Sequence, residues 1–198
     1  MKLLLATRNQ DKIKEIKTIL KDTNLEFLTL EQVAPKLFIP ENGRTLEANA
    51  RKKALLAMQA TRLPSLAEDT GLEVYALDGA PGVYSARYSG PNMKYEDNVK
   101  KLLQEMENIP ANRRRARFRT VFALAIPNKK VKLFQGFCPG TIIKQPRGKS
   151  GFGYDPIFIP KDYRITFGRM SIKTKNRISH RAKALRKVRI FLDKYFNE

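Results

Sequence analysis

Two adjacent carboxylates, Glu68 and Asp69, are the residues of this chain whose types and setting best suit catalysis. They follow an apolar run over residues 63–67, which predicts a buried strand. Residues 63–86 include no Lys or Arg, although the chain holds 39 of them against 19 Asp and Glu. Mg²⁺ in proteins takes one or two carboxylates together with the phosphate oxygens of a substrate. The pair therefore indicates a metal site for a polyphosphate; the alternative is a turn held by the acids, with a positive φ at Gly71.

A second polar group lies where the first predicted strand, over residues 2–6, leads into a predicted helix over residues 10–20. The helix start offers free backbone N–H groups and the positive end of the helix dipole, which can bind a phosphate. Alternatively, Asn9 caps the helix and Lys12 lies on the surface. The segment is not a P-loop, because the only Gly-Lys-Ser, at residues 148–150, has Ile143 in place of the first glycine. The members of the group are Thr7, Arg8, Asn9, Gln10, Asp11 and Lys12.

Two further segments offer groups suited to a nucleotide base. Phe152 and Asp155, separated by Gly153 and Tyr154, combine an aromatic face with a carboxylate that can accept from the edge of a base. A core Phe at the edge of a strand is the alternative. Residues 179–181, Ser-His-Arg, place hydrogen-bond donors at the start of the final predicted helix, and no neighbouring sequence indicates a Ser/His/Asp triad.

The formal net charge of +20 attracts phosphate, whether the phosphate belongs to a nucleic acid or to a free nucleotide. Basic residues cluster at residues 113–119 and at residues 163–192, and a solvated face is the alternative explanation. One Cys and one His exclude an intramolecular disulfide and a Cys/His zinc site. The first apolar stretch is too short for a signal peptide or a membrane span, so we expect a cytoplasmic protein without membrane contact.

The remaining pattern predicts strands that alternate with helices. We expect strands over residues 26–30, 72–77 and 154–159, a hairpin over 118–126 and 131–137, and helices over 45–60, 95–107 and from residue 179 onward. The helix over 10–20 places Ile13, Ile16, Ile19 and Leu20 on one face, and the last helix places Leu185, Val188, Leu192 and Tyr195 on one face. Thr45 is the expected N-cap of the helix that starts there. No repeat or linker marks a boundary. The pattern predicts an α/β protein with a mixed sheet, as one domain over residues 1–198.

Five motifs in order resemble the inosine triphosphate pyrophosphatase family over nearly the whole chain. They are ATRN at residues 6–9, AEDTGL at 67–72, GAPGVYSARY at 79–88, GFGYDP at 151–156 and ISHRA at 178–182. The resemblance implies an elongated mixed β-sheet flanked by helices, two lobes with a central substrate cleft, and a homodimer. It also implies hydrolysis of ITP, dITP or XTP to the monophosphate and pyrophosphate, which clears deaminated purines from the nucleotide pool.

The resemblance also implies a role for each motif. The segment from Thr7 to Lys12, with Lys53, would hold the triphosphate. Glu41 and Asp69 would bind Mg²⁺, with Mn²⁺ as a possible substitute, and Asp69 would accept the proton of the attacking water. Around the purine, Phe152 would stack with Gly153 and Tyr154 beside it, Thr70 would lie near the substrate, and Asp155, Lys175, His180 and Arg181 would read the edge of the base.

Three residues depart from the family pattern. Arg8 stands where the family commonly has Gly or another small residue, Ala48 stands before Asn49 in place of a frequent Glu, and Thr174 stands before Lys175 in place of another. Two other functions stay open on the sequence alone. One is a basic nucleic-acid-binding protein that uses residues 113–119 and 173–189, and the other is a pyrophosphatase for another class of nucleotide.

Overall fold

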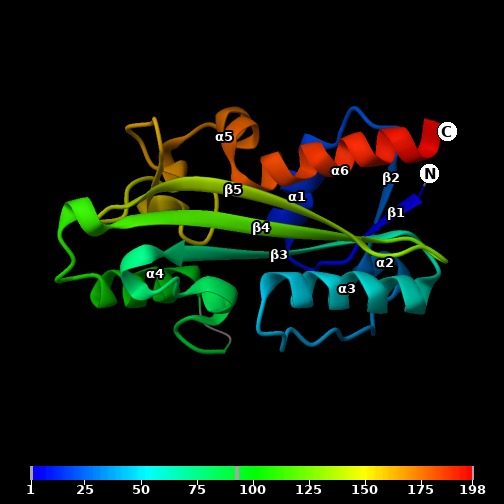
Figure 1. Cartoon of the computed structure of the whole chain (residues 1–198), viewed down its shortest axis with the longest axis horizontal. Helices are drawn as coiled ribbons and strands as arrows, with labels where there is room; N and C mark the ends of the chain where they lie inside the picture. Colours follow the sequence, from blue (N-terminus) through cyan, green and yellow to red (C-terminus); the bar gives the residue numbers. More distant parts are fainter. Residues whose placement is uncertain (1, 92–93, 198) are drawn as a thin grey trace. The chain divides into compact units, whose positions relative to one another are not determined.

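The protein is an α/β structure built on a mixed β-sheet, as the computed structural model shows for residues 2–91 and 94–197 (Figure 1). The sheet order within these residues is β2-β1-β3-β4-β5-β6. Strand β1 pairs in parallel with β2 and β3, whereas β5 and β6 are antiparallel. The predicted fold class is confirmed. The strands are β1 (Lys2–Leu5), β2 (Glu26–Thr29), β3 (Ser65–Val74), β4 (Arg115–Ala125), β5 (Lys132–Ile142) and β6 (Phe158–Pro160).

The helices flank this sheet and lie close to their predicted ranges. Helix α3 is capped by Thr45, as expected, because its side chain accepts from the Ala48 N–H. Two short helices, α2 and α5, were not predicted, and Ser179 is the C-cap residue of α5 immediately before α6. The helices are α1 (Gln10–Ile19), α2 (Leu30–Val33), α3 (Leu46–Thr61), α4 (Tyr95–Glu105), α5 (Ile172–Ile178) and α6 (His180–Asn197).

The chain forms two compact units, and each is assembled from separate stretches of sequence. The first unit comprises Met1–Asp69, Thr120–Gly136 and Arg181–Glu198; the second comprises Thr70–Arg119 and Phe137–His180. This exchange between the units explains why no linker is visible in the sequence. No helix of the described residues is both long enough and apolar enough to cross a membrane.

Each unit has its own apolar core. In the first unit, the predicted faces of α1 and α6 meet buried side chains of β1, β3 and β4, and Figure 1 shows α3 on the other side of the sheet. Its members include Ile13, Ile16, Leu20, Leu185, Val188 and Leu192. The second core gathers side chains of α4, β4 and β5 with those around β6, among them Val99, Leu102, Phe118, Ile142, Phe158 and Phe167. Burial of such faces stabilises the helices, because apolar area leaves water.

Strand β3 differs from its prediction in a way that matters for the site. Glu68 and Asp69 lie inside the strand rather than after its end, and the strand predicted over residues 72–77 is its continuation as far as Val74. The alternative of a turn with a positive φ at Gly71 is also wrong. A Cβ at Gly71 would lie 2.4 Å from the Gly82 carbonyl oxygen, so the glycine is required by the close approach of that loop.

The strand predicted over residues 154–159 is also wrong in its first half. Asp155–Ile157 form a 3₁₀ helix, and β6 covers only Phe158–Pro160. The Asp155 carboxylate accepts the Phe152 N–H at 2.8 Å, and Pro156 occupies the first turn of the short helix. Both features favour a turn over an extended strand.

Candidate active site

The predicted phosphate segment forms the capped start of α1. The Asn9 side chain accepts the Lys12 N–H at 3.1 Å, and the Thr7 hydroxyl accepts the Asn9 N–H at 3.2 Å. Asn9 is therefore the N-cap, as one of the two sequence interpretations expected. Gln10 and Asp11 are exposed in the first turn, where the Asp11 carboxylate complements the helix dipole.

Arg8 connects this segment to the loop that carries Glu41. Its guanidinium Nη2 donates to the carbonyl oxygens of Pro35 and Leu37, at 2.6 and 3.1 Å. The side chain is exposed, so each bond is solvent-accessible, but together they hold two peptide groups of the same loop. Arg8 thus fixes backbone in this structure, and its predicted contact with phosphate stays a prediction.

Glu68 is the centre of a buried ionic cluster in the first unit. Arg181 binds it through two nitrogens, with Nε 2.8 Å from Oε2 and Nη2 3.0 Å from Oε1. The Lys12 Nζ lies 3.0 Å from Glu68 Oε1, and Glu15 accepts a further bond from Arg181 Nη1. Two parallel bonds between a guanidinium and a carboxylate are the strongest form of this contact.

Charge within this cluster sets the ionisation of its members. Burial alone would raise the pKa of Glu68, but Arg181 and Lys12 hold that pKa well below its usual range. Burial alone would lower the pKa of Arg181, and Glu68 with Glu15 instead raises it. Both Glu68 oxygens are bonded to cations, so this carboxylate is a structural anchor and is poorly suited to act as a base.

Asp69, the next residue along β3, has a different environment. Asn49 Nδ2 donates to Asp69 Oδ2 at 2.9 Å, and Lys53 Nζ lies 3.5 Å from Oδ1. Asn49 and Lys53 are four residues apart on α3 and therefore share one helix face. Asn49 also accepts the Gly43 N–H at 2.7 Å, which ties the Glu41 loop to α3. Sequence reasoning missed this role of Asn49, although its spacing from Lys53 was a usable signal.

The pKa of Asp69 is raised, opposite to that of Glu68. The main cause is burial, which disfavours the charged carboxylate, and the Glu41 charge adds to it. Lys53, Lys12 and the Asn49 hydrogen bond act against this rise. A carboxylate with a raised pKa accepts a proton more readily than an ordinary one, as a general base requires.

The donor atoms around Lys53 fit a hard divalent cation. The Lys53 ammonium lies 2.5 Å from Glu41 Oε1 and 3.5 Å from Asp69 Oδ1, so both carboxylates reach one positive charge. Among the described residues no three His, Cys, Asp or Glu side chains gather around a possible metal position. Two carboxylates match the demand of Mg²⁺, which completes its shell with water and phosphate oxygens.

The second unit brings together Phe152, Asp155 and Lys175. Asp155 Oδ2 accepts the Lys175 ammonium at 2.5 Å, and Asp155 is nearly fully buried. The same ammonium lies 5.0 Å from the centre of the half-buried Phe152 ring, and Tyr95 lies beside that ring at 5.8 Å. The loop thus presents a partly exposed aromatic face with a cation and a carboxylate next to it.

The other residues predicted near a base have defined positions in the second unit. The buried His180 imidazole stacks on Phe118, with ring centres 4.6 Å apart. The Tyr154 hydroxyl donates to the Ser85 carbonyl at 2.9 Å, so this ring supports the fold of the loop. Gly153 has a φ of +62°, which a glycine adopts without strain. Thr70 is partly buried in β3 directly after Asp69.

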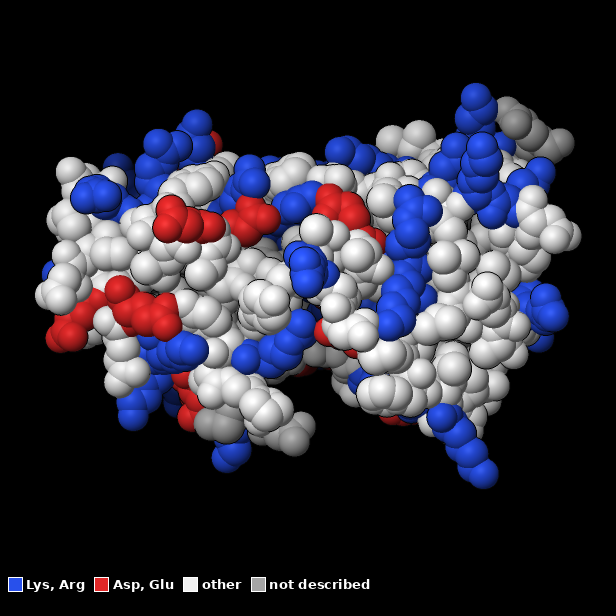
Figure 2. All heavy atoms as spheres, turned by 60° about the horizontal axis from the view of Figure 1, so that its bottom comes forward, with Lys and Arg blue, Asp and Glu red and all other residues white. Residues whose placement is uncertain are grey.

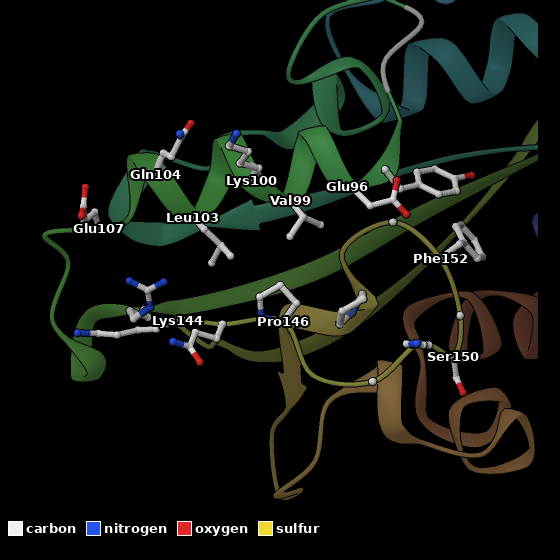
Figure 3. A pocket seen from close by; sticks show the side chains of 18 residues that line it. Glu96, Val99, Lys100, Leu103, Gln104, Glu107, Lys144, Pro146, Ser150 and Phe152 are labelled. Carbon is white, nitrogen blue, oxygen red and sulfur yellow. The ribbon is translucent and has the colours of Figure 1, made fainter.

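A large hollow lies in the second unit between α4 and the loop at residues 144–153 (Figure 3). Its volume is about 1210 Å³, and Phe152 lies at one end with Glu107 and Lys144 at the other. Asp155, Lys175 and His180 are absent from its described lining, so it meets the predicted base site only around Phe152. Sequence reasoning missed this hollow, because most of its lining residues belong to no motif; the exceptions are Gly151, Phe152, Gly153 and Pro156 of the GFGYDP motif.

The Glu68 cluster generates a prediction about stability. Glu68→Gln leaves the buried Arg181 without its bidentate partner, and breaking such a pair costs about 3–5 kcal/mol of unfolding free energy. The wild-type contribution is present above the ordinary carboxyl pKa and is lost as the pH falls below about 4, because the folded pKa is lowered. Urea denaturation across pH 3–7 measures both effects.

Glu31→Gln is the matched control for this substitution. Glu31 is exposed and accepts a long 3.4 Å bond from Gln10, so its loss should change the unfolding free energy by less than about 0.5 kcal/mol. Equal losses in the two variants would contradict the anchoring role of Glu68.

Comparison with known proteins gives the same result as the motifs. The sequence model of the Ham1 family matches residues 3–191. A dITP/XTP pyrophosphatase of Desulforamulus reducens is 43% identical over 99% of this chain and 98% of its own, and one of Geobacter sulfurreducens is 46% identical over 93% and 92%. These names confirm the family that the five motifs resemble.

Solved structures agree with the fold as well. A Ham1 protein of Staphylococcus aureus is 37% identical, with a TM-score of 0.89 over 98% of this chain and 100% of its own. A HAM1 protein of Coxiella burnetii gives the same TM-score at 36% identity, over 98% and 99%. Because sequence and fold agree over nearly the full length, this chain belongs to the Ham1 family.

Proposed function

We propose that this protein hydrolyses the deaminated purine nucleoside triphosphates ITP, dITP and XTP to the monophosphate and pyrophosphate. The observation that carries the proposal is Asp69, a buried carboxylate oriented by Asn49 and paired with Lys53. The names of the relatives support the substrate class. The activity would clear damaged nucleotides from the precursor pool.

The first unit would bind the triphosphate. The capped start of α1 offers backbone N–H groups, and Lys12 and Lys53 lie beside carboxylates from which they can turn toward phosphate. Arg8, Gln10 and Asp11 border the same helix start, and Thr7 and Asn9 shape it. Positive charge here would stabilise the charge that develops on the leaving pyrophosphate.

Glu41 and Asp69 would hold Mg²⁺ or, in its place, Mn²⁺. The bound ion would neutralise charge on the phosphate oxygens. Asp69 would also orient the attacking water and accept its proton, for which its raised pKa suits it. Asn49 would keep the carboxylate in one orientation during this transfer, because its amide donates to Oδ2.

The second unit would bind the base. Phe152 would stack on the purine, with Gly153 and Tyr154 shaping the loop and Thr70 nearby, while Asp155, Lys175 and His180 would contact its edge. A carbonyl at position 6 of the purine can accept from a cation, whereas the amine of adenine would face it with another donor. Mismatched buried polar groups of this kind support large discrimination.

Arg181 differs from the other residues predicted to read the base, because its guanidinium is bonded to Glu68 and Glu15. Its predicted contact with the base would require it to leave these partners or to use its remaining donor capacity. We propose that it contributes chiefly by positioning the strand that carries Asp69. A homodimer, implied by the family resemblance, and a cytoplasmic location, expected from the sequence, complete the proposal.

A substrate panel tests the reaction directly. We expect pyrophosphate from ITP, dITP and XTP in the presence of Mg²⁺, little turnover of ATP and GTP, and loss of activity with a chelator. Separation of the phosphorus-containing products measures this. Orthophosphate as the product, or equal turnover of ATP, would mean that the fold serves another nucleotide reaction.

Asp69→Asn tests the proposed base. The amide keeps the size of the carboxylate but cannot accept the proton, so kcat should fall about 10²- to 10⁴-fold while the unfolding transition persists. Asp162→Asn is the control, because Asp162 is exposed and lies outside the proposed site. Retained activity in the Asp69 variant would overturn its assignment.

The pH profile tests the role of Asn49. Its hydrogen bond favours the charged form of Asp69, so Asn49→Ala should raise the pKa of Asp69 further. Activity needs the carboxylate, so the acidic limb of kcat should move to higher pH. Asn42→Ala, which removes an exposed contact with Lys52, should leave the limb in place. An unchanged limb in both variants would show that Asn49 does not tune Asp69.

A further inference from the structure

The second unit carries a surface on which cations and aromatic rings alternate. The guanidinium of Arg115 lies 5.8 Å from the Tyr75 ring centre, and that of Arg117 lies 6.0 Å from Tyr75 and 5.2 Å from Phe137. Arg119 follows at 5.7 Å from Phe137. We call these five residues the arginine ladder. The proposed pyrophosphatase reaction uses none of them.

The ladder follows from the two-residue period of strand β4. Ala116, Phe118 and Thr120 are buried, so the alternate arginines lie on the opposite face of the strand. Arg115 is exposed and Arg117 partly so, and 47% of Tyr75 and 37% of Phe137 remain accessible to solvent. Guanidinium groups and the exposed parts of both aromatic side chains are therefore available to a partner.

The arginine ladder has a net positive charge. Glu73 pairs with Arg117 at 2.5 Å and contacts Arg119 at 3.7 Å, which offsets one charge. Arg113 and Arg115 extend the positive surface beyond this pair. The chain as a whole has a formal charge of +20. Figure 2 shows Lys and Arg at many places on the face of the molecule that it draws.

A shallow hollow adjoins one end of the ladder. It is lined by Tyr75, Ala76, Asn112, Arg113 and Arg115, and its volume is about 450 Å³. The Tyr75 ring, the Asn112 amide and the guanidinium groups of this hollow can contact a flat polar group that carries or adjoins a phosphate. This combination of groups is typical of a site that binds a nucleotide unit rather than a simple anion.

We propose that the arginine ladder binds single-stranded nucleic acid. Arginines would contact successive phosphates, and unpaired bases would stack on the exposed parts of the Tyr75 and Phe137 rings and on the guanidinium planes beside them. In a duplex the base faces are already stacked, so only the phosphate contacts would remain. An acidic peptide would use the cations but not the rings, and a second copy of the ladder would bring arginines against arginines.

Fluorescence anisotropy with labelled 20-nucleotide oligo(dT), oligo(U) and a duplex of equal length tests the proposal. We expect both single strands to bind more tightly than the duplex, with affinity that falls steeply as salt increases. Arg115→Ala should weaken binding and make the salt slope smaller by about 0.7. Tyr75→Leu should weaken binding about 5- to 150-fold and leave the salt slope unchanged.

Matched controls separate this surface from bulk charge. The double variant Lys129→Ala, Lys130→Ala removes two exposed charges from the loop between β4 and β5 and should change single-strand affinity less than Arg115→Ala does. Pyrophosphatase activity of each variant confirms folding, since the ladder lies outside the proposed site. No binding at moderate salt, preference for the duplex, or an equal loss in the lysine control would overturn the proposal.

Discussion

The candidate active site of the first unit depends on one buried interaction, the pairing of Glu68 with Arg181. The carboxylate belongs to β3 and the guanidinium to the start of α6, 113 residues later in the chain. Lys12 from α1 completes the cluster. Because successive residues of a strand face opposite sides, an anchored Glu68 also fixes how Asp69 is presented. Asp69 is therefore held in place with only one close hydrogen bond, from Asn49, and a longer contact with Lys53, and its pKa stays raised.

The two adjacent acids show how environment decides chemistry. Glu68 has cations on both oxygens, and its pKa is lowered. Asp69 is buried beside an amide and a more distant ammonium, and its pKa is raised. Environments that shift the pKa values of two titratable groups in opposite directions distinguish a carboxylate with a structural role from one that can act as a base. The sequence indicated the two acids but not their different roles, because the side chains that contact them come from α1, α3 and α6.

Local patterns predicted the parts of the fold that local interactions determine. The apolar periods of α1 and α6 were correct, as was Thr45 as the cap of α3. The course of β3 through Gly71 was not predictable, because Asp-Thr-Gly favours a turn and only the distant Gly82 loop reveals why the glycine is there. Asp155 was also expected in a strand, but its bond to the Phe152 N–H and the following Pro156 favour a turn instead.

The basic residues of this chain differ in what they contact, so its high positive charge has more than one role. Lys12, Lys53, Lys175 and Arg181 each bind a specific carboxylate, so they offset charges that the fold itself brings together. Arg8 instead donates to backbone carbonyls. The arginine ladder differs from both groups, because its cations lie against accessible rings with one carboxylate among them. A count of basic residues treats these cases alike, whereas the partner of each cation separates charge that builds a site from charge that is presented to another molecule.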